Sequence, residues 1–194
     1  MMRFARRVPA AAVFPALVAL LAPPLAGALD PGRYLVLDNG LRVFLYEKRD
    51  LPLVHIVTGF DLGSKDETET TNGLVHLLEH VILFRGAASG ARAGAEARRH
   101  GAYFNGSTSQ DLAVFEMSLP SANAAFGLRN QRDVLFGLDL SAAELEAEKE
   151  VVLEELGEME NDPDRAAADR VRRELFAGHP YGRAVYGDPT VIAA

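Results

Sequence analysis

The sequence has no cysteine among its 194 residues, which excludes disulfide bonds, a lipid anchor on an N-terminal cysteine and a zinc site with thiolate ligands. Any metal ion must therefore be held by histidine, aspartate or glutamate. Basic residues are also few, since 20 lysines and arginines stand against 27 acids. The remaining composition, 48% hydrophobic and 24% charged, is that of a globular chain with enough apolar residues for one domain with a core.

The first 28 residues differ from the rest and predict a secretory signal peptide. Three arginines precede an apolar run over residues 8–25, and Ala26-Gly27-Ala28 has the small-x-small form that signal peptidase cleaves. An uncleaved membrane anchor is the alternative, but four prolines interrupt the run, which is also short for a membrane span. We therefore expect an exported chain with no stable span after cleavage. The lack of cysteine suits the bacterial periplasm, and secretion further out stays open.

Removal of residues 1–28 makes the chain strongly acidic. That segment contains three arginines and no acid, so 17 basic and 27 acidic side chains remain, a formal charge of −10. Such a surface repels the phosphate backbone of DNA and RNA. We expect no nucleic acid among the partners.

Residues 29–194 predict an α+β domain with two layers, a largely antiparallel mixed sheet and helices packed on one face. Asn39-Gly40 favours a two-residue type I′ turn in a hairpin, and a third consecutive strand follows it in the same sheet. The remaining strands and helices are predicted from the local sequence pattern of each segment. The expected strands are 34–37, 41–46, 54–62, 102–108 and 112–119, and the expected helices are 74–84, 95–100, 124–138, 141–160 and 165–177.

Several caps and turns can be assigned from residue type. Thr71 or Asn72 is expected to cap the helix at 74–84, and Asp164 the helix at 165–177. Ser141-Ala142-Ala143-Glu144 has the form of a capping box. Asn105-Gly106 has two interpretations, a tight turn or a sheet-edge position presented to an extended ligand. The histidines at positions 55, 100 and 179 are expected to be structural rather than ligands.

The segment 74–84 is apolar except for His76, Glu79 and His80. At about 100° per residue these three share one narrow stripe of a helix. Leaving them as an incidental buried cluster would cost several kcal/mol, whereas two imidazoles one turn apart are a ready pair of zinc ligands. Glu79 is better placed to meet a water molecule on the ion than the ion itself, and could move its proton.

A catalytic zinc needs a third protein ligand, and the acid-rich helix at 141–160 is the natural donor. Glu148 and Glu155 are two turns apart, on the same side as Val151 and Val152, whereas Glu154 lies about 100° away. We therefore expect Glu155 to bind the ion. Glu148 is expected to lie behind it and to orient a histidine or the site.

The order His76-Leu77-Leu78-Glu79-His80 is the His-x-x-Glu-His motif of the inverted zincins. Its surroundings resemble the pitrilysin family of metallopeptidases, which includes insulin-degrading enzyme and the mitochondrial processing peptidase. The resemblance covers nearly all of residues 33–194. The other segments that carry it are 63–67 with 73–76, 103–109, 148–155, and 179–182 with Gly187.

The resemblance implies one zinc ion on His76, His80 and Glu155, water activation by Glu79, support of catalysis by Glu148 and positioning of a peptide by Asn105. The implied activity is that of a zinc-dependent endopeptidase, which hydrolyses short or unfolded peptides with a zinc-bound water that Glu79 activates. The peptide would bind in extended form at the sheet edge.

Two substitutions and the length depart from the family pattern. Lys149 stands where arginine is usual, and Gly106 where alanine is commoner. Family members continue with a returning strand and a second similar domain, so residues 29–194 are expected to be an incomplete N-terminal domain. A second family domain or a partner subunit is the expected partner. The alternative is a zinc-binding but catalytically silent fragment or subunit that needs the missing half.

Overall fold

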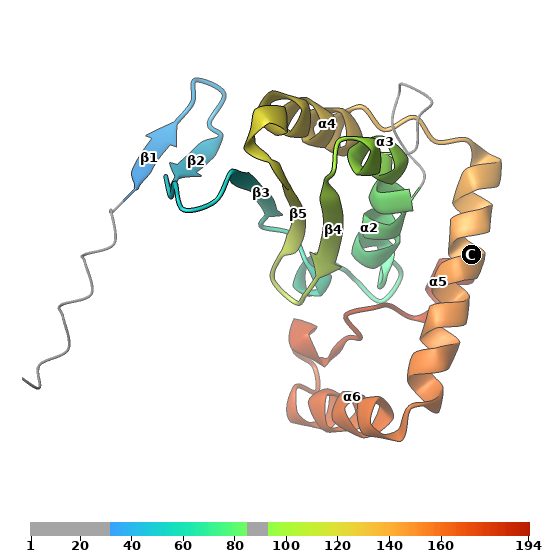
Figure 1. The fold of residues 1–194 in the computed structure, drawn as a ribbon. Helices are drawn as coiled ribbons and strands as arrows, with labels where there is room; N and C mark the ends of the chain where they lie inside the picture. Colours follow the sequence, from blue (N-terminus) through green and yellow to red (C-terminus); the bar gives the residue numbers. More distant parts are fainter. Residues whose placement is uncertain (1–31, 85–92) are drawn as a thin grey trace, which may run out of the picture. The chain divides into compact units, whose positions relative to one another are not determined.

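The computed structural model describes residues 32–84 and 93–194, so the predicted signal peptide lies outside the described residues (Figure 1). The chain divides into two compact units, of which the first ends at Leu51 and the second runs from Pro52 to Ala194. Within the described ranges no helix is both long and apolar enough to cross a membrane.

The first unit contains the predicted hairpin, made of strands β1 (Arg33–Val36) and β2 (Arg42–Leu45). Its turn differs from the expected one, because only Gly40 has a positive φ, +83°. The Leu37 carbonyl accepts from Gly40 N–H at 2.8 Å, and Leu37 N–H donates to the Leu41 carbonyl at 2.9 Å. This is a three-residue loop with Gly40 at the left-handed position of a bulge. Asn39 keeps a negative φ and accepts a hydrogen bond from Leu41 N–H through its side chain.

The second unit is built on a three-stranded antiparallel sheet in the order β3-β5-β4, with β3 at Leu53–Phe60, β4 at Tyr103–Thr108 and β5 at Ala113–Pro120. The expectation that the first three strands form one sheet is therefore wrong. β1 and β2 pair with each other, whereas β3 pairs along its length with β5. Strand β5 takes the centre because its alternate residues are fully buried, from Ala113 to Leu119.

Asn105-Gly106 lies inside β4, paired with Glu116 and Phe115 of β5, so the tight-turn interpretation is wrong. The ladder with β5 extends through both residues, and neither has a positive φ. Among the strands that the structure describes, β4 pairs only with β5, which leaves it at the sheet edge.

Helices cover one face of this sheet, as the predicted two-layer fold requires. The core joins residues of α2 (Leu74–Phe84), β5 and α4 (Ala124–Phe136), among them Ile82, Phe115 and Val134. Helix α3 (Ala93–Arg99) packs on β4 and ends before Gly101, whose φ is +69°. All pairs among the described strands are antiparallel.

The long helix α5 (Ala142–Asn161) packs against the side of α2 that faces away from the sheet, so α2 lies between β4 and α5 (Figure 1). A second core cluster joins Leu77 and Val81 of α2 to Val152 of α5 and Ile192 of the last helix, α7 (Pro189–Ala193). Helix α5 begins with the predicted capping box of Ser141 and Glu144. This packing brings His76 and His80 of α2 to face α5.

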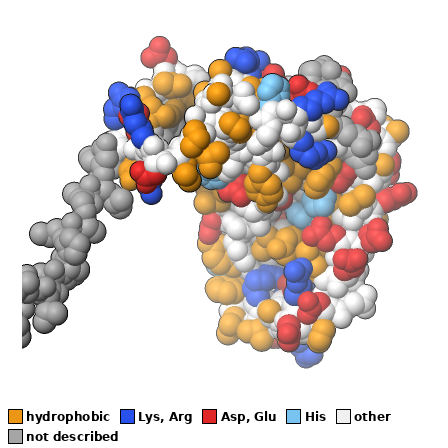
Figure 2. Space-filling model, viewed as in Figure 1, with side chains coloured by type: hydrophobic (Ala, Val, Ile, Leu, Met, Phe, Trp, Pro, Cys, Tyr) orange, Lys and Arg blue, Asp and Glu red, His pale blue; other side chains and the backbone are white. Residues whose placement is uncertain are grey.

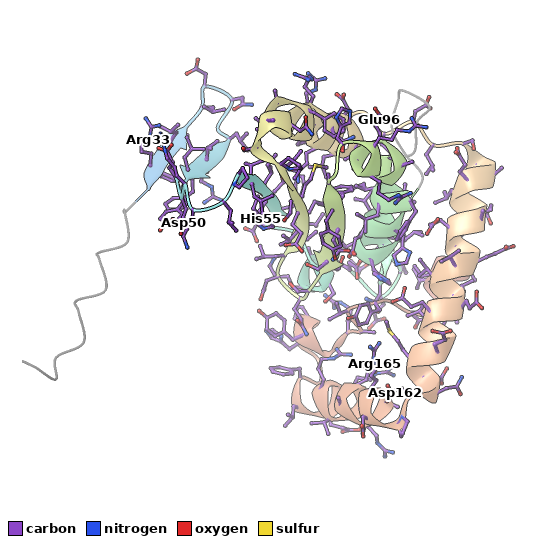
Figure 3. The ribbon with its side chains drawn as sticks, viewed as in Figure 1. Arg33, Asp50, His55, Glu96, Asp162 and Arg165 are labelled. Carbon is purple, nitrogen blue, oxygen red and sulfur yellow. The ribbon has the colours of Figure 1, made fainter. Side chains whose placement is uncertain are left out.

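Helix α6 (Pro163–Leu175) is capped by Asp162 and not by Asp164. Because Pro163 occupies the first helical position and has no N–H, the Asp162 carboxylate accepts from the next two amides, of Asp164 and Arg165. Figure 3 labels Asp162 and Arg165 at this junction. The short 3₁₀ helices are η2 (Ser64–Asp66), η3 (Ser121–Asn123) and η4 (Pro180–Gly182).

The start of α2 is also capped differently from the expectation. The Thr71 hydroxyl accepts from Thr68 N–H, and the Asn72 side chain is a donor here rather than an acceptor. The free amides of Gly73 and Val75 donate instead to the carboxylate of Glu67. The cap therefore comes from a residue seven positions before the first residue of the helix, a longer separation than in any local capping pattern.

Candidate metal centre

The polar stripe of α2 is buried between two elements, with its histidines facing α5 and Glu79 facing β4. The side chains of His76 and His80 are 4% and 12% exposed, and Glu79 is also buried. On α5 the side chain of Glu148 is 2% exposed, and that of Glu155 is 34% exposed. Both α5 acids therefore face the two histidines, and Glu155 stands where the site reaches solvent.

Three ligand atoms converge between the helices. One carboxylate oxygen of Glu155, Oε2, lies 3.1 Å from His80 Nε2 and 3.9 Å from His76 Nε2. One atom from each of these three residues lies within 4.8 Å of the others. A tetrahedral zinc ion with bonds of about 2 Å needs ligand atoms about 3.3 Å apart. The two separations from Glu155 Oε2, 3.1 and 3.9 Å, lie near this value.

The second nitrogen of each imidazole meets an acceptor. His76 Nδ1 lies 3.1 Å from the backbone carbonyl of Tyr186, and His80 Nδ1 lies 3.1 Å from Glu148 Oε1. A carbonyl can only accept, so His76 Nδ1 carries the proton. His80 has a carboxylate oxygen 3.1 Å from each of its ring nitrogens, Glu148 Oε1 at Nδ1 and Glu155 Oε2 at Nε2. His76 Nε2 then carries a lone pair that faces Glu155 and can bind a metal. His80 Nε2 can do the same when the His80 proton is on Nδ1 beside Glu148, which is the arrangement that metal-binding histidines adopt.

Burial shifts the pKa values of His76 and Glu79. Loss of solvent lowers the pKa of His76, and the neighbouring His80 lowers it further, against the opposing effect of Glu155. The neutral imidazole is the form that binds a metal. Burial raises the pKa of Glu79, and a hydrogen bond from Thr108 opposes that rise. A carboxyl whose pKa is raised is suited to taking up and releasing a proton.

Glu79 is held against β4 rather than among the three converging atoms. Thr108 Oγ1 donates to Glu79 Oε2 at 2.5 Å. Gly106, two residues earlier on the same face of β4, provides the space, because a Cβ there would lie 2.9 Å from Glu79 Cγ. Glu79 therefore lies beside the candidate metal position, with a fixed hydrogen-bond partner.

Asn105 lies at the sheet edge but on the other face of β4. Successive strand residues point to opposite faces, and Gly106 and Thr108 face α2, so the Asn105 side chain is directed away from Glu79. Its partner across the sheet is Glu116. The structure thus brings five of the six predicted site residues together and leaves Asn105 at the adjoining edge.

The spacing of residues in α5 predicted that Glu148 and Glu155 face inward. Val152 between them is buried and Glu154 is exposed, but Val151, which was expected to share their side, is 42% exposed. Acidic side chains gather along the α5 side of the molecule in Figure 2. Most of these acids are therefore a solvated surface, and the candidate site uses two of them.

Sequence reasoning missed three residues that hold the site. Thr108 hydrogen-bonds Glu79, the Tyr186 carbonyl meets His76, and Glu67 caps α2. Only Thr108 had a usable signal, since it shares a strand face with Gly106. A backbone carbonyl leaves no signature in the residue type, and Glu67 is separated from α2 by a turn of several residues.

The other histidines have structural partners. His55 Nδ1, on the labelled residue in Figure 3, lies 2.8 Å from Ser118 Oγ. The His100 ring stacks on Phe126 at 3.7 Å, and His179 Nδ1 accepts from Tyr181 N–H. In the described part of the chain, His76, His80 and Glu155 are the one group of three such side chains that could hold a metal ion.

Two curated proteins are similar in sequence to most of this chain. A probable mitochondrial-processing peptidase subunit beta of Schizosaccharomyces pombe is 30% identical over 167 residues, which are 82% of this chain and 35% of that protein. An uncharacterized zinc protease of Mycobacterium tuberculosis is 32% identical over 172 residues, 87% of this chain and 38% of that protein. The chain thus spans little more than a third of the length of these relatives.

Solved structures share the fold. The periplasmic protease PqqL of Escherichia coli matches with a TM-score of 0.77 at 23% identity, over 85% of this chain and 19% of that chain. A structure described as a peptidase inactive domain from Pseudomonas fluorescens matches with a TM-score of 0.74 at 24% identity, over 84% of this chain and 40% of that chain. At these sequence identities, the two structural matches show a shared α+β fold.

The family model described as Insulinase (Peptidase family M16) matches residues 43–189, a range that includes the polar stripe of α2 and both α5 acids. Because that range is well over half of the 194 residues, the chain belongs to the insulinase family of peptidases.

Proposed function

We propose that this chain carries the metal-binding and proton-transferring part of a zinc-dependent endopeptidase. The observation that carries the proposal is the convergence of His76 Nε2, His80 Nε2 and Glu155 Oε2 on one point, beside the buried Glu79. Curated relatives named zinc proteases support zinc as the ion. The short separations of the three ligand atoms and the hydrogen-bond acceptor beside each Nδ1 also support such an ion.

The chemistry follows from the charge states of these residues. When bound, a zinc ion supplies a Lewis acid that polarises a peptide carbonyl and lowers the pKa of water. Glu79 takes the proton of the attacking water and passes it to the leaving amine. The hydrogen bond from Thr108 fixes the carboxylate for this transfer, while Glu148 and the Tyr186 carbonyl keep the two imidazoles oriented.

The proposed substrate is a short or unfolded peptide that adds to the free edge of β4 in extended form. Edge strands offer unpaired backbone groups to another chain, and β4 has only β5 as a partner among the described strands. Glu79 and Thr108 lie on one side of this strand, and Asn105 on the other. We assign Asn105 to positioning the peptide from the face opposite Glu79.

We further propose that residues 1–28 direct export and that the chain works in the periplasm with a second family domain or a partner subunit. A periplasmic protease among the structural neighbours supports the compartment. The relative named as a subunit supports the partner. Both assignments extend to this chain by similarity.

The second candidate is a chain that binds zinc but cleaves nothing alone. It is favoured because the chain covers only 35% and 38% of the two curated relatives, and because one structural neighbour is described as an inactive domain. The two candidates share the metal site. They differ in whether residues outside this chain are needed for turnover.

The test is hydrolysis of an internally quenched, unstructured peptide by the zinc-loaded chain, alone and with a second chain that supplies the rest of a relative. Glu79→Gln should lower kcat by about 100-fold or more, because general acid–base catalysis contributes about that much. Its zinc content should stay at one per chain. Unchanged hydrolysis in Glu79→Gln contradicts the proposed role of Glu79, and zinc binding without hydrolysis in either mixture favours the second candidate.

A further inference from the structure

A buried carboxylate links the start of α2 to a distant part of the chain. Glu67 Oε2 accepts from Gly73 N–H and from the Asn72 side chain, both at 2.9 Å, and Glu67 Oε1 accepts from Val75 N–H at 2.8 Å. Both Glu67 and Asn72 are buried. The first turn of the helix that carries His76 is therefore fixed by one side chain.

Asn72 also holds the segment 184–188, more than 110 residues later. Its side-chain amide donates to the carbonyl of Ala184 at 2.8 Å, and its backbone carbonyl accepts from Asp188 N–H at 3.2 Å. One residue thus binds both ends of a five-residue segment. The two hydrogen bonds leave little freedom for the residues between them.

The middle of that segment touches the candidate metal ligand. The Tyr186 carbonyl meets His76 Nδ1 at 3.1 Å, and the Tyr186 and His76 rings meet edge to face at 5.0 Å. The next residue, Gly187, packs on Gly73, and a Cβ on either glycine would lie 2.7 Å or less from the Cα of the other. Backbone thus lies directly on backbone, and the position of Tyr186 is set by Asn72.

We propose that Glu67 and Asn72 are positioning residues for His76. They hold segment 184–188 so that the Tyr186 carbonyl keeps the proton on His76 Nδ1 and leaves Nε2 directed at Glu155. Without them His76 loses its preferred tautomer and orientation, and zinc binds more weakly. This inference rests on the proposed zinc site, and it adds to that site two residues that touch no predicted ligand atom.

A purely structural role is the competing account, since loss of a helix cap lowers stability wherever it occurs. The two accounts can be separated by removing a comparable helix cap elsewhere in the chain and comparing the effect on zinc affinity. Asp162 likewise accepts from two backbone amides at the start of α6, and the hydrogen bonds and ion pair of its side chain are with residues of α6. Asp162→Ala is therefore the control for lost stability alone.

The experiment compares Asn72→Ala, Glu67→Gln and Asp162→Ala in the full chain by three measurements. These are zinc affinity by competition with a chromophoric chelator, thermal unfolding of the metal-free protein, and the ¹⁵N chemical shifts of the His76 ring. We expect a loss of zinc affinity of about 10- to 100-fold in the first two variants, the range for removing an outer partner of a metal ligand. Asp162→Ala should keep wild-type affinity although its unfolding temperature falls.

The His76 ring separates this inference from the metal site. In the metal-free wild type we expect the Nδ1–H form, and in Asn72→Ala a mixture of the two neutral tautomers. Wild-type zinc affinity and an unchanged His76 tautomer in both Asn72→Ala and Glu67→Gln overturn the inference. A wild-type chain that binds no zinc overturns the proposed metal site, whereas a tautomer change in that case still supports the positioning of His76.

Discussion

Replacement of Glu155 by glutamine should weaken zinc binding, while the same change one residue earlier should not. Glu155 Oε2 lies within hydrogen-bonding distance of His80 Nε2 and is the one carboxylate oxygen in the converging set, whereas Glu154 is exposed. Both variants remove one negative charge from the same turn of α5. Any difference between them therefore reflects the position of the carboxylate and not the net charge.

The expected loss of zinc affinity can be estimated from the removal of one protein ligand of the metal. Removing an outer partner of a ligand weakens metal binding by about 10- to 100-fold, so loss of the anionic ligand itself should cost at least about 100-fold. Zinc at 100 times the wild-type Kd raises the free energy of unfolding by about 2.7 kcal/mol. At that same concentration Glu155→Gln would gain only about 0.4 kcal/mol.

The difference, about 2.3 kcal/mol, should appear as a zinc-induced rise in Tm that is roughly 5–9 °C smaller in Glu155→Gln, given about 2–4 °C per kcal/mol for a domain of this size. Differential scanning calorimetry with and without zinc measures it, with metal analysis of the dialysed protein as a check. Glu154→Gln should match the wild type. A full zinc response in Glu155→Gln, or its loss in Glu154→Gln, would refute the ligand assignment.

Three further predictions concern Glu79 and its surroundings. Thr108→Val should lower kcat/KM by about 10- to 100-fold at unchanged zinc content, because a hydrogen bond to a charged group contributes about 1.5–3 kcal/mol. Thr108→Ser keeps the hydroxyl and should retain most of the rate. Equal rates in both variants would exclude a role for the Thr108 hydrogen bond in the reaction. Burial lowers the pKa of His76 below its usual 6.5, so as the pH falls the unfolded chain takes up a proton on this imidazole before the folded protein does. The metal-free protein should therefore lose stability as the pH falls from about 6.5, and urea titrations should show a smaller loss of stability in His76→Gln. An identical pH dependence in the two proteins would contradict the buried neutral state. Gly106→Ala should lower the free energy of unfolding in urea by about 1–3 kcal/mol, because the added Cβ would lie 2.9 Å from Glu79 Cγ and 3.2 Å from Leu83 Cδ1. A stability equal to that of the wild type would show that Glu79 moves aside freely.

The parts of the structure that depend on local periodicity were predicted from the sequence. Helix α5, with its capping box, and the buried stripe of α2 follow from spacing alone. The seven-residue interval between Glu148 and Glu155 was enough to select two inward-facing acids among eight glutamates of α5. In each case the relevant neighbours are within two turns along the chain.

The parts that failed depend on side chains that compete for the same backbone groups. Asn39 keeps a negative φ because its side chain accepts from Leu41 N–H, so the expected type I′ turn does not form. Thr71 is engaged in its own turn, which leaves the α2 cap to Glu67. Such choices are settled by small energy differences between alternative hydrogen bonds, and the residue types alone do not determine them.

The site's contacts with segment 184–188 could not be predicted for a different reason. The group that meets His76 is the Tyr186 carbonyl, and every residue has a carbonyl. Its place is set by Asn72, which is more than 110 residues away from Ala184 in the sequence. Contacts of this kind depend on the tertiary fold and carry no local pattern.

The separation of the candidate ligands also has a consequence for biosynthesis. His80 and Glu155 are 75 residues apart in the sequence, so a ribosome that adds about 5–20 residues per second makes α2 roughly 4–15 s before it makes the last ligand. During that interval the nascent chain offers two imidazoles and no third donor at this site. A zinc ion held by all three would therefore join α2 and α5 only after α5 has been synthesised, and it would close a 75-residue loop that the unfolded chain leaves open.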